Sequence, residues 1–216
     1  MLVTQAVANR RSIRQFAADP VSDDTLRELL ELSARAPSGG NLQPWRIYVV
    51  NGDSLAGFRE FIADRPIEDG EYDIYPPSLW EPHRTNRFAL GEQMYAALGI
   101  GREDKAGRLE QFAKNDDFFG APAGLFCFID RGLGPPQWSD LGMFLQTFML
   151  LAQQAGLDTC PQEWWSVRHR AVSEFVGAPD NEMLFCGMAI GHAAADSPVN
   201  SLVSERMPLD QWAKFV

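Results

Sequence analysis

The chain has 216 residues, of which 45% are hydrophobic and 22% charged, so it can bury a sizeable core in a single domain spanning residues 1–216. Its net charge of −10 argues against general binding to nucleic acid or to an anionic membrane surface, since both depend on dense positive potential. No apolar run approaches the ~20 residues that span a bilayer. The three cysteines lie in mostly apolar stretches and suit reduced, buried thiols rather than a disulfide or a metal site. We therefore expect a cytoplasmic protein.

The first quarter of the chain predicts three helices and one strand. Residues 4–9 form a short helix, and Ser22 is a good N-cap for a second one over residues 23–36, where leucines recur at helical spacing. Residues 46–50 are β-branched or aromatic and predict a strand, and a further helix follows over residues 54–63. The order is therefore helix, helix, strand, helix.

The segment 65–87 has a different composition. Four prolines and several acidic residues interrupt it, and its aromatic side chains favour an ordered flap over a loose linker. We expect an irregular excursion here that forms a wall of a binding pocket. Helical patterning resumes over residues 91–98 and 103–114.

The second half of the chain alternates strands with helices. Residues 124–129 form a continuous apolar run, typical of a strand buried on both faces. The helix predicted for residues 137–155 is apolar around most of its circumference, which places it in a core or at a subunit interface. Short strands are expected at 157–161 and 183–189, with a helix at 167–176 between them. The fold class is therefore α+β, with many helices around four or five short strands.

A basic cluster lies just after the first predicted helix, in the sequence Arg10-Arg11-Ser12-Ile13-Arg14. An extended backbone would place Arg10, Ser12 and Arg14 on one face, because side chains alternate with period two. Two guanidiniums that flank a hydroxyl suit a phosphate dianion. Alternatively, the cluster is a solvated basic surface or is ion-paired.

The loop at residues 38–43 reads Ser-Gly-Gly-Asn-Leu-Gln and lies between the second helix and the first strand. Its glycines allow a ligand to approach the backbone closely, while Asn41 and Gln43 offer donors and acceptors that match the edge of a flavin or a purine. The alternative is a simple helix C-terminal turn closed by Pro44. No G-x-G-x-x-G or G-x-x-x-x-G-K-[ST] nucleotide fingerprint is present.

The usual signatures of hydrolases are also absent. None of the three histidines belongs to an H-E-x-x-H motif, and no G-x-S-x-G motif could supply a serine nucleophile. Catalysis by this chain, if present, would therefore borrow the chemistry of a bound cofactor.

Several motifs occur together, in order, along nearly the whole chain. They are Arg-Arg-Ser-Ile-Arg-Gln-Phe at 10–16, Ala-Pro-Ser-Gly-Gly-Asn-Leu-Gln-Pro-Trp at 36–45, Gly-Leu-Asp-Thr-Cys-Pro-Gln-Glu at 156–163, Gly-Met-Ala-Ile-Gly-His at 187–192, and Arg206. In these segments the sequence resembles the FMN-dependent nitroreductase family.

The resemblance implies a nitroreductase-like α+β fold, with a central mixed or antiparallel sheet surrounded by helices. It also implies an intertwined homodimer with two FMN sites at the interface and a C-terminal extension, near residues 193–216, that reaches the partner subunit. By the same resemblance, the residues that would bind FMN are Arg10, Arg11, Ser12, Arg14, Pro37, Ser38, Gly39, Asn41, Gln43, Pro161, Gln162, Glu163 and Arg206. Arg10, Ser12, Arg14 and Arg206 would hold the phosphate and ribityl end. The 37–43 loop would come from the neighbouring subunit, and the 161–163 turn would lie beside the isoalloxazine.

The activity that the resemblance implies is reduction of nitroaromatic compounds, or of related quinones, with NAD(P)H as electron donor. A two-electron hydride transfer would pass through flavin N5 in a ping-pong cycle, with no catalytic side chain. Alternatives on the same scaffold are reduction of free flavin, of an activated alkene or of a halogenated phenol, or flavin binding with little turnover.

Two residues depart from the commoner family pattern, namely Trp164 after Glu163 and Ser204 where a lysine is frequent. Trp80, Trp138 and Trp164 are candidates for stacking on a flat aromatic acceptor, although ordinary packing would explain them equally well.

Overall fold

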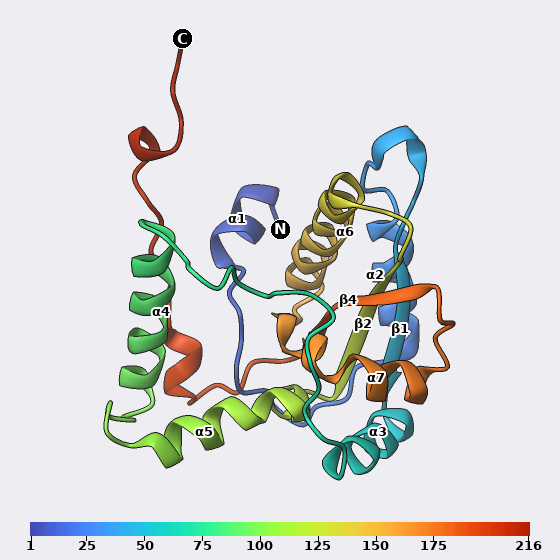
Figure 1. Cartoon of the computed structure of the whole chain (residues 1–216), viewed down its shortest axis with the longest axis horizontal. Helices are drawn as coiled ribbons and strands as arrows, with labels where there is room; N and C mark the ends of the chain where they lie inside the picture. The colour runs from blue at the N-terminus through green and yellow to red at the C-terminus, as the bar shows by residue number, and fades with distance from the viewer.

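A four-stranded antiparallel sheet, in the order β1-β2-β4-β3, organises the chain. The computed structural model describes residues 1–216, and Figure 1 shows the sheet at the centre of the fold. The strands are β1 (Arg46–Asn51), β2 (Ala123–Asp130), β3 (Asp158–Gln162) and β4 (Glu182–Gly191). The α+β class is thus confirmed, and the number of strands is at the lower end of the expected range.

Seven α-helices surround this sheet. They are α1 (Val3–Asn9), α2 (Asp23–Ser33), α3 (Asp53–Ala63), α4 (His83–Ala97), α5 (Lys105–Ala113), α6 (Pro135–Gln154) and α7 (His169–Val176). Helices α2 and α6 pack on one face of the sheet, whereas α3, α7 and the 3₁₀ segment η3 (Glu163–Arg168) cover the other. The two faces therefore carry two separate hydrophobic cores.

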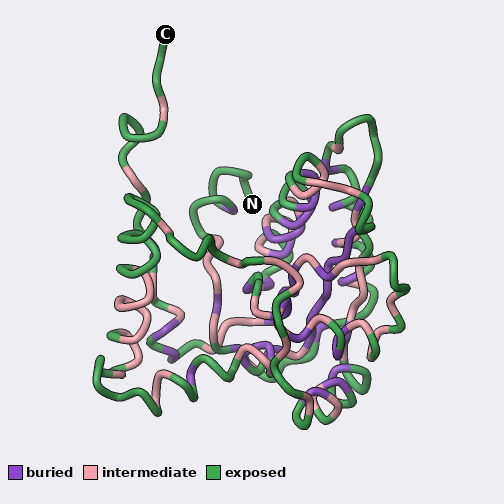
Figure 2. The backbone as a smooth tube through the Cα atoms, viewed as in Figure 1, coloured by how far each residue is buried: buried purple, intermediate pink, exposed green.

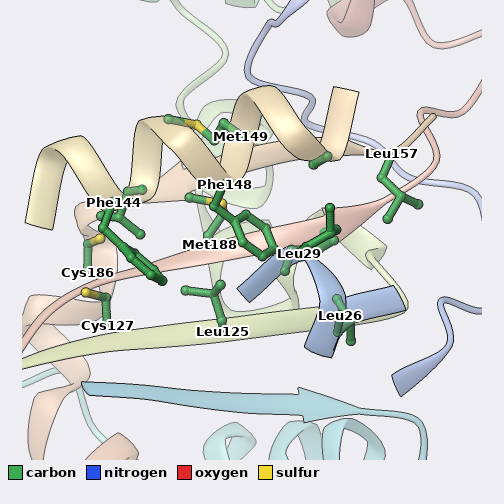
Figure 3. Close-up of a cluster of buried hydrophobic side chains, with 14 of the residues drawn as sticks. Leu26, Leu29, Leu125, Cys127, Phe144, Phe148, Met149, Leu157, Cys186 and Met188 are labelled. Carbon is green, nitrogen blue, oxygen red and sulfur yellow. The ribbon is translucent and has the colours of Figure 1, made fainter. Parts of the chain in front are cut away.

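Strand β2 and helix α6 form the centre of the first core. Every residue of β2 except Asp130 is buried, as the continuous apolar run predicted. Figure 3 shows Phe144, Phe148 and Met149 of α6 above Leu125 of β2 and the leucines of α2. Helix α6 begins two residues earlier than expected, because prolines are well tolerated in the first turn of a helix, where the missing N–H costs no hydrogen bond.

The three cysteines are buried and free. Burial raises the pKa of Cys160 to about 11 and that of Cys186 to about 12, and it raises the pKa of Cys127 as well. The thiols are therefore protonated at neutral pH, as expected for small buried side chains.

The irregular segment after α3 is shorter than the sequence suggested, because α4 begins at His83 rather than at residue 91. The first turns of α4 contain polar residues without apolar periodicity, so the hydrophobic pattern does not reveal them. Other boundaries differ by one to three residues. For example, α2 ends at Ser33, and residues 163–168 form η3 before α7 starts.

The first part of the excursion is bound to the body of the protein. The Glu68 N–H donates to Val167 O at 2.9 Å and the Glu71 N–H to Ser166 O at 3.0 Å. The Glu71 carboxylate, whose side chain is only 6% exposed, contacts both Arg131 and His169. This part of the excursion is therefore an ordered cover over η3.

Three peripheral segments, namely α1, α4 and the C-terminal segment, bury little of their surface in a single chain. In Figure 1, α4 and the C-terminal segment stand beside the sheet layers, and in Figure 2 much of α1, the first half of α4 and the last residues are exposed. Helix α4 buries no residue at all. No helix of the chain has the length and apolarity needed to cross a membrane.

Candidate functional site

A cavity of about 1100 Å³ lies between the N-terminal segment, α4 and the C-terminal segment. Five of the sequence-predicted site residues line it, although one of them is far from the others in the sequence: Arg10, Arg11, Ser12, Arg14 and Arg206. The fold thus brings together the two ends of the proposed phosphate clamp.

The basic cluster is held along the edge of the sheet. Ser12 forms a parallel bridge with Thr159 of β3, and the Ile13 N–H donates to Thr159 O at 3.0 Å. Ile13 is buried in the second core, while Ser12 and Arg14 line the cavity. This is the alternation expected of an extended backbone. Arg11, which strict alternation would turn away, also lines the cavity.

Arg206 is oriented by its own segment of chain. Its Nη1 donates to Ser204 Oγ at 2.6 Å, to Ser204 O at 3.0 Å and to Glu205 O at 2.9 Å. Ser204 was one of the two departures from the family pattern. Here its hydroxyl helps to fix the guanidinium that it accompanies.

The cavity has an excess of unpaired positive charge. Its five arginines are Arg10, Arg11, Arg14, Arg87 and Arg206, and none of them has a carboxylate partner within 4.0 Å, although eight other arginines of the chain do. Burial, followed by repulsion from the Arg206 guanidinium, lowers the pKa of Arg10. The only carboxylate residue in the lining is Glu205, so the cavity has a net positive charge that favours an anionic ligand.

The turn at residues 161–163 lies next to this cluster. The guanidiniums of Arg14 and Arg10 are close enough to Cys160 of β3 to oppose the rise in its pKa that burial causes, and Pro161 follows directly. Burial also raises the pKa of the Glu163 carboxyl. The basic cluster therefore continues toward the turn that was expected beside the flavin ring.

The side chain of Gln162 is occupied within the protein. Its Nε2 donates to Asn115 O at 3.0 Å and to Asn115 Oδ1 at 3.1 Å, and its Oε1 accepts a hydrogen bond from Trp165 Nε1 at 3.3 Å. With the amide so fixed, the groups that this turn can offer a ligand come chiefly from its backbone.

The glycine-rich loop is built as a rigid, exposed bend. Gly40, Asn41 and Gln43 all have positive φ values, of 58°, 58° and 49°, a conformation that costs energy for residues with side chains. The Gln43 N–H donates to Ser38 Oγ at 3.0 Å and closes the bend. Such strain in a short loop is typical of a binding site.

Helix α6 supports this loop. The Gly39 N–H donates to the buried Asp140 carboxylate at 3.2 and 3.3 Å, and Trp45 stacks on Phe144 with ring centroids 4.9 Å apart. None of Pro37, Ser38, Gly39, Asn41 and Gln43 lines the arginine-rich cavity of the same chain. Asp140 was not recognised from the sequence, because a single carboxylate in an apolar helix carries no motif.

The three candidate tryptophans do not line the cavity either. Trp138 packs against Tyr72 and Phe185 with ring centroids 6.0 and 6.1 Å apart, so packing accounts for it. Trp80 is 60% exposed, and its ring lies 5.6 Å from that of His83. Trp164 Nε1 donates to Asp116 Oδ1 at 2.6 Å, next to the Glu163 turn. Of the three, Trp164 is nearest in sequence to the expected flavin site.

Helix α4 supplies residues that the sequence reasoning missed. Asn86, Arg87, Leu90 and Gln93 line the cavity opposite the basic cluster. Their polar run has no recognisable motif, so only the packing of α4 reveals them. No group of histidine, cysteine or carboxylate side chains could hold a metal ion.

Comparison with known proteins supports a specific family. Residues 7–192 match the family model described as the nitroreductase family. A 4-nitrobenzoate reductase from Pseudomonas putida is 37% identical over 97% of this chain and 92% of its own length. A nitrobenzene nitroreductase from Ectopseudomonas oleovorans is 34% identical, over 99% of this chain and 96% of its own.

Solved structures agree with these sequence matches. The FMN and NADPH-dependent nitroreductase NfnB from Sphigopyxis sp. strain HMH superimposes with a TM-score of 0.96 at 44% identity, covering 100% of this chain and 99% of that one. The FMN-dependent nitroreductase NfnB from Mycobacterium smegmatis, solved in complex with NADPH, has a TM-score of 0.92 at 27% identity over 100% of both chains.

Proposed function

This protein is a member of the nitroreductase family, and we propose that it binds FMN and uses NAD(P)H to reduce nitroaromatic compounds. Relatives that match nearly the whole chain are named as reductases of 4-nitrobenzoate, nitrobenzene and chloronitrobenzene. The most similar of the solved structures described above is named as FMN- and NADPH-dependent. The chain is therefore an oxidoreductase, and its substrates are small electron-poor aromatic molecules.

The convergence of unpaired arginines carries this proposal. FMN has a phosphate dianion at one end, and the cavity offers guanidiniums from Arg10, Arg14 and Arg206 together with the Ser12 hydroxyl. Planar guanidiniums bind phosphate through paired charge-assisted hydrogen bonds. The lowered pKa of Arg10, which reflects burial and the nearby Arg206, fits a cluster that is completed by such an anion.

When bound, FMN supplies the redox chemistry, since its ring accepts a hydride from NAD(P)H and delivers it to the acceptor. In this proposal, the backbone of Pro161, Gln162 and Glu163 would lie beside that ring, and Arg14, at the phosphate and ribityl end, could also lean toward its pyrimidine edge. Fixed N–H donors and positive charge favour the build-up of negative charge on the ring. The hydrogen bonds that hold Gln162 and the burial of Trp165 keep these donors in position.

We further propose that the protein works as a homodimer. The glycine-rich loop is exposed and absent from the cavity of its own chain, so a second chain is needed to bring Ser38 and Asn41 to the flavin. Large apolar side chains are also exposed on α1 and at the C-terminus, notably Leu2, Val3, Val7, Trp212 and Phe215. Burial of such side chains between subunits would stabilise the dimer. Light scattering on the purified protein would measure the mass directly.

The three buried free thiols suit a reducing compartment, and we place the protein in the cytoplasm. We also treat residues 1–216 as a single domain, because both hydrophobic cores share the one sheet.

An anaerobic titration tests the function. We expect purified protein to show the visible bands of FMN, to lose them on addition of NADPH or NADH, and to regain them when 4-nitrobenzoate or nitrobenzene is added. Protein that takes up no FMN on reconstitution would contradict the proposal. Parallel assays with free flavin, an activated alkene and a halogenated phenol would show whether another acceptor is preferred, and flavin that no reductant bleaches would indicate a binding protein with little turnover.

A further inference from the structure

Arg87 of α4 is a cation in the cavity that the FMN clamp does not use. It lines the same cavity as Arg10, Arg14 and Arg206, but it comes from α4 and not from the segments that are proposed to hold the phosphate. No carboxylate lies within ion-pair distance of its guanidinium, because none of the ion pairs of the chain includes it.

The neighbouring arginines, unlike Arg87, form ion pairs with carboxylates. Arg84, one helical turn earlier, pairs with Glu81 at 2.8 Å and does not line the cavity. Arg102 and Arg108 both pair with Glu92 of α4, at 2.9 and 2.8 Å. The other arginines on and around α4 are thus paired with carboxylates, whereas Arg87 has no carboxylate partner and remains available to a ligand.

Arg87 is nevertheless held in a defined position. Its Cζ lies 4.0 Å from the centroid of the Tyr75 ring, a cation–π contact. A cation–π contact uses none of the acceptors that an ion pair would supply, so the guanidinium still has N–H groups to donate to an anion. The Tyr75 contact therefore orients the group without neutralising it.

The charge in the cavity exceeds what one phosphate needs. The lining holds five guanidiniums, those of Arg10, Arg11, Arg14, Arg87 and Arg206, and one carboxylate, that of Glu205, so its positive charges outnumber the two negative charges of the FMN phosphate even after Glu205 is subtracted. A further guanidinium on the opposite wall indicates a second anionic group. Both nicotinamide donors carry a pyrophosphate, and NADPH alone carries a further anionic group, the 2′-phosphate of its adenosine ribose.

The position of Arg87 favours the dinucleotide over the nitroarene. The cavity lining contains the phosphate clamp but not the residues 161–163, which stand beside the flavin ring in the proposed function. A small aromatic acceptor reacts at that ring, whereas a dinucleotide is long enough to place its phosphate away from it. We propose that Arg87, seated on Tyr75, binds the 2′-phosphate of NADPH and makes it the preferred electron donor. This inference rests on the proposed function, because it assumes an FMN-loaded enzyme that takes electrons from a nicotinamide nucleotide.

Calorimetry with two fragments of the donor tests the assignment without turnover. Adenosine 2′,5′-bisphosphate carries the 2′-phosphate, and AMP does not. We expect the FMN-loaded protein to bind the bisphosphate more tightly than AMP, and Arg87→Gln to reduce this ratio about tenfold, the effect of losing one charged hydrogen-bond partner. Arg84→Gln is the matched control, and its ratio should equal that of the wild type.

Steady-state kinetics provide a second measurement. The ratio of kcat/KM for NADPH to that for NADH should fall about tenfold in Arg87→Gln and stay constant in Arg84→Gln. Equal affinity of the wild type for the two fragments, or an unchanged ratio in Arg87→Gln, would overturn the assignment. A change confined to 4-nitrobenzoate relative to nitrobenzene would overturn it too, because it would assign Arg87 to the carboxylate of the acceptor.

These outcomes are separate from a failure of the proposed function. A protein that holds FMN and reduces nitroarenes, but shows no Arg87 effect, would refute only the donor assignment. A protein that holds no FMN would refute the proposed function itself, and the fragments could still be titrated against it to ask whether Arg87 selects the 2′-phosphate.

Discussion

Gly187 is the position where a single methyl group should have the largest effect on this fold. It lies in β4, directly opposite Gln162 of β3. A Cβ built there would lie 2.7 Å from Trp165 Nε1 and 3.2 Å from Trp165 Cγ, and nearer still to Cδ1. Contacts below 3.0 Å require something to move, so Gly187→Ala forces the Trp165 indole out of its place.

The indole has little room to move. Trp165 is fully buried, and its ring centroid lies 4.7 Å from that of Phe118, 5.2 Å from Phe126 and 5.5 Å from Phe58. Overpacking at such a site costs about 3 kcal/mol, the upper end of the usual range. For a chain of this length, the loss corresponds to a decrease in Tm of about 6–12 °C. The shift should also weaken FMN binding, because Trp165 Nε1 donates to Gln162 Oε1 in the turn that we propose lies beside the flavin ring.

The matched control is the same substitution in an open position. Gly57 is an exposed residue of α3 with no atom within 4 Å of an added Cβ, so Gly57→Ala should stabilise the helix by up to about 1 kcal/mol and raise Tm by about 2–4 °C. Both variants should be melted by circular dichroism as FMN-free protein at equal concentration, since ligand binding and association raise Tm. A Gly187→Ala protein that melts within about 2 °C of wild type would refute the reasoning from Trp165.

Three further outcomes are expected. Arg10→Ala combined with Arg14→Ala should release FMN on gel filtration at low micromolar protein, and full retention would contradict the phosphate clamp. Asp140→Ala removes the acceptor of the Gly39 N–H. It should lower the free energy of unfolding in urea by about 1–3 kcal/mol and weaken FMN binding. An unchanged free energy of unfolding together with unchanged FMN affinity would show that the loop does not depend on this hydrogen bond. Hydrogen bonds and ion pairs with Arg108 and Arg102 lower the pKa of Glu92 from 4.5 to about 2. Its stabilising effect should therefore be full above pH 4.5 and be lost as the pH falls toward 2, and a carboxyl carbon signal that titrates near 4.5 would exclude the lowered pKa.

The sequence was sufficient for the elements that have a strong local pattern. The continuous apolar run of β2, the nearly all-round apolar surface of α6 and the Ser22 cap of α2 each depend on a few neighbouring residues, and all three are present. The start of α4 at His83 was missed because its first turns are polar and exposed. Hydrophobic periodicity reports only on helices that bury one face.

The site residues, like the helices and strands, could be predicted where a local motif contained them. The types and spacing of Arg10, Ser12 and Arg14 suggested a phosphate site, the family resemblance added Arg206, and the structure places all four around one cavity. The tryptophans could not be assigned, since an aromatic side chain serves a core and a pocket equally well. In the structure Trp138 packs against Tyr72 and Phe185, and Trp164 is bound to Asp116.

By itself, the sequence indicated the family and the order of the main strands and helices, and it predicted which residues would form the cofactor site. Only the tertiary structure decided which charges share one cavity: Arg206 lies beside the basic cluster, Arg87 faces it from α4, and the glycine-rich loop of the same chain stays apart. The reason is physical. Local pattern follows from contacts between neighbours in the chain, whereas these placements depend on how β3 pairs with the N-terminal segment and how α4 packs, which are contacts between residues far apart in the sequence.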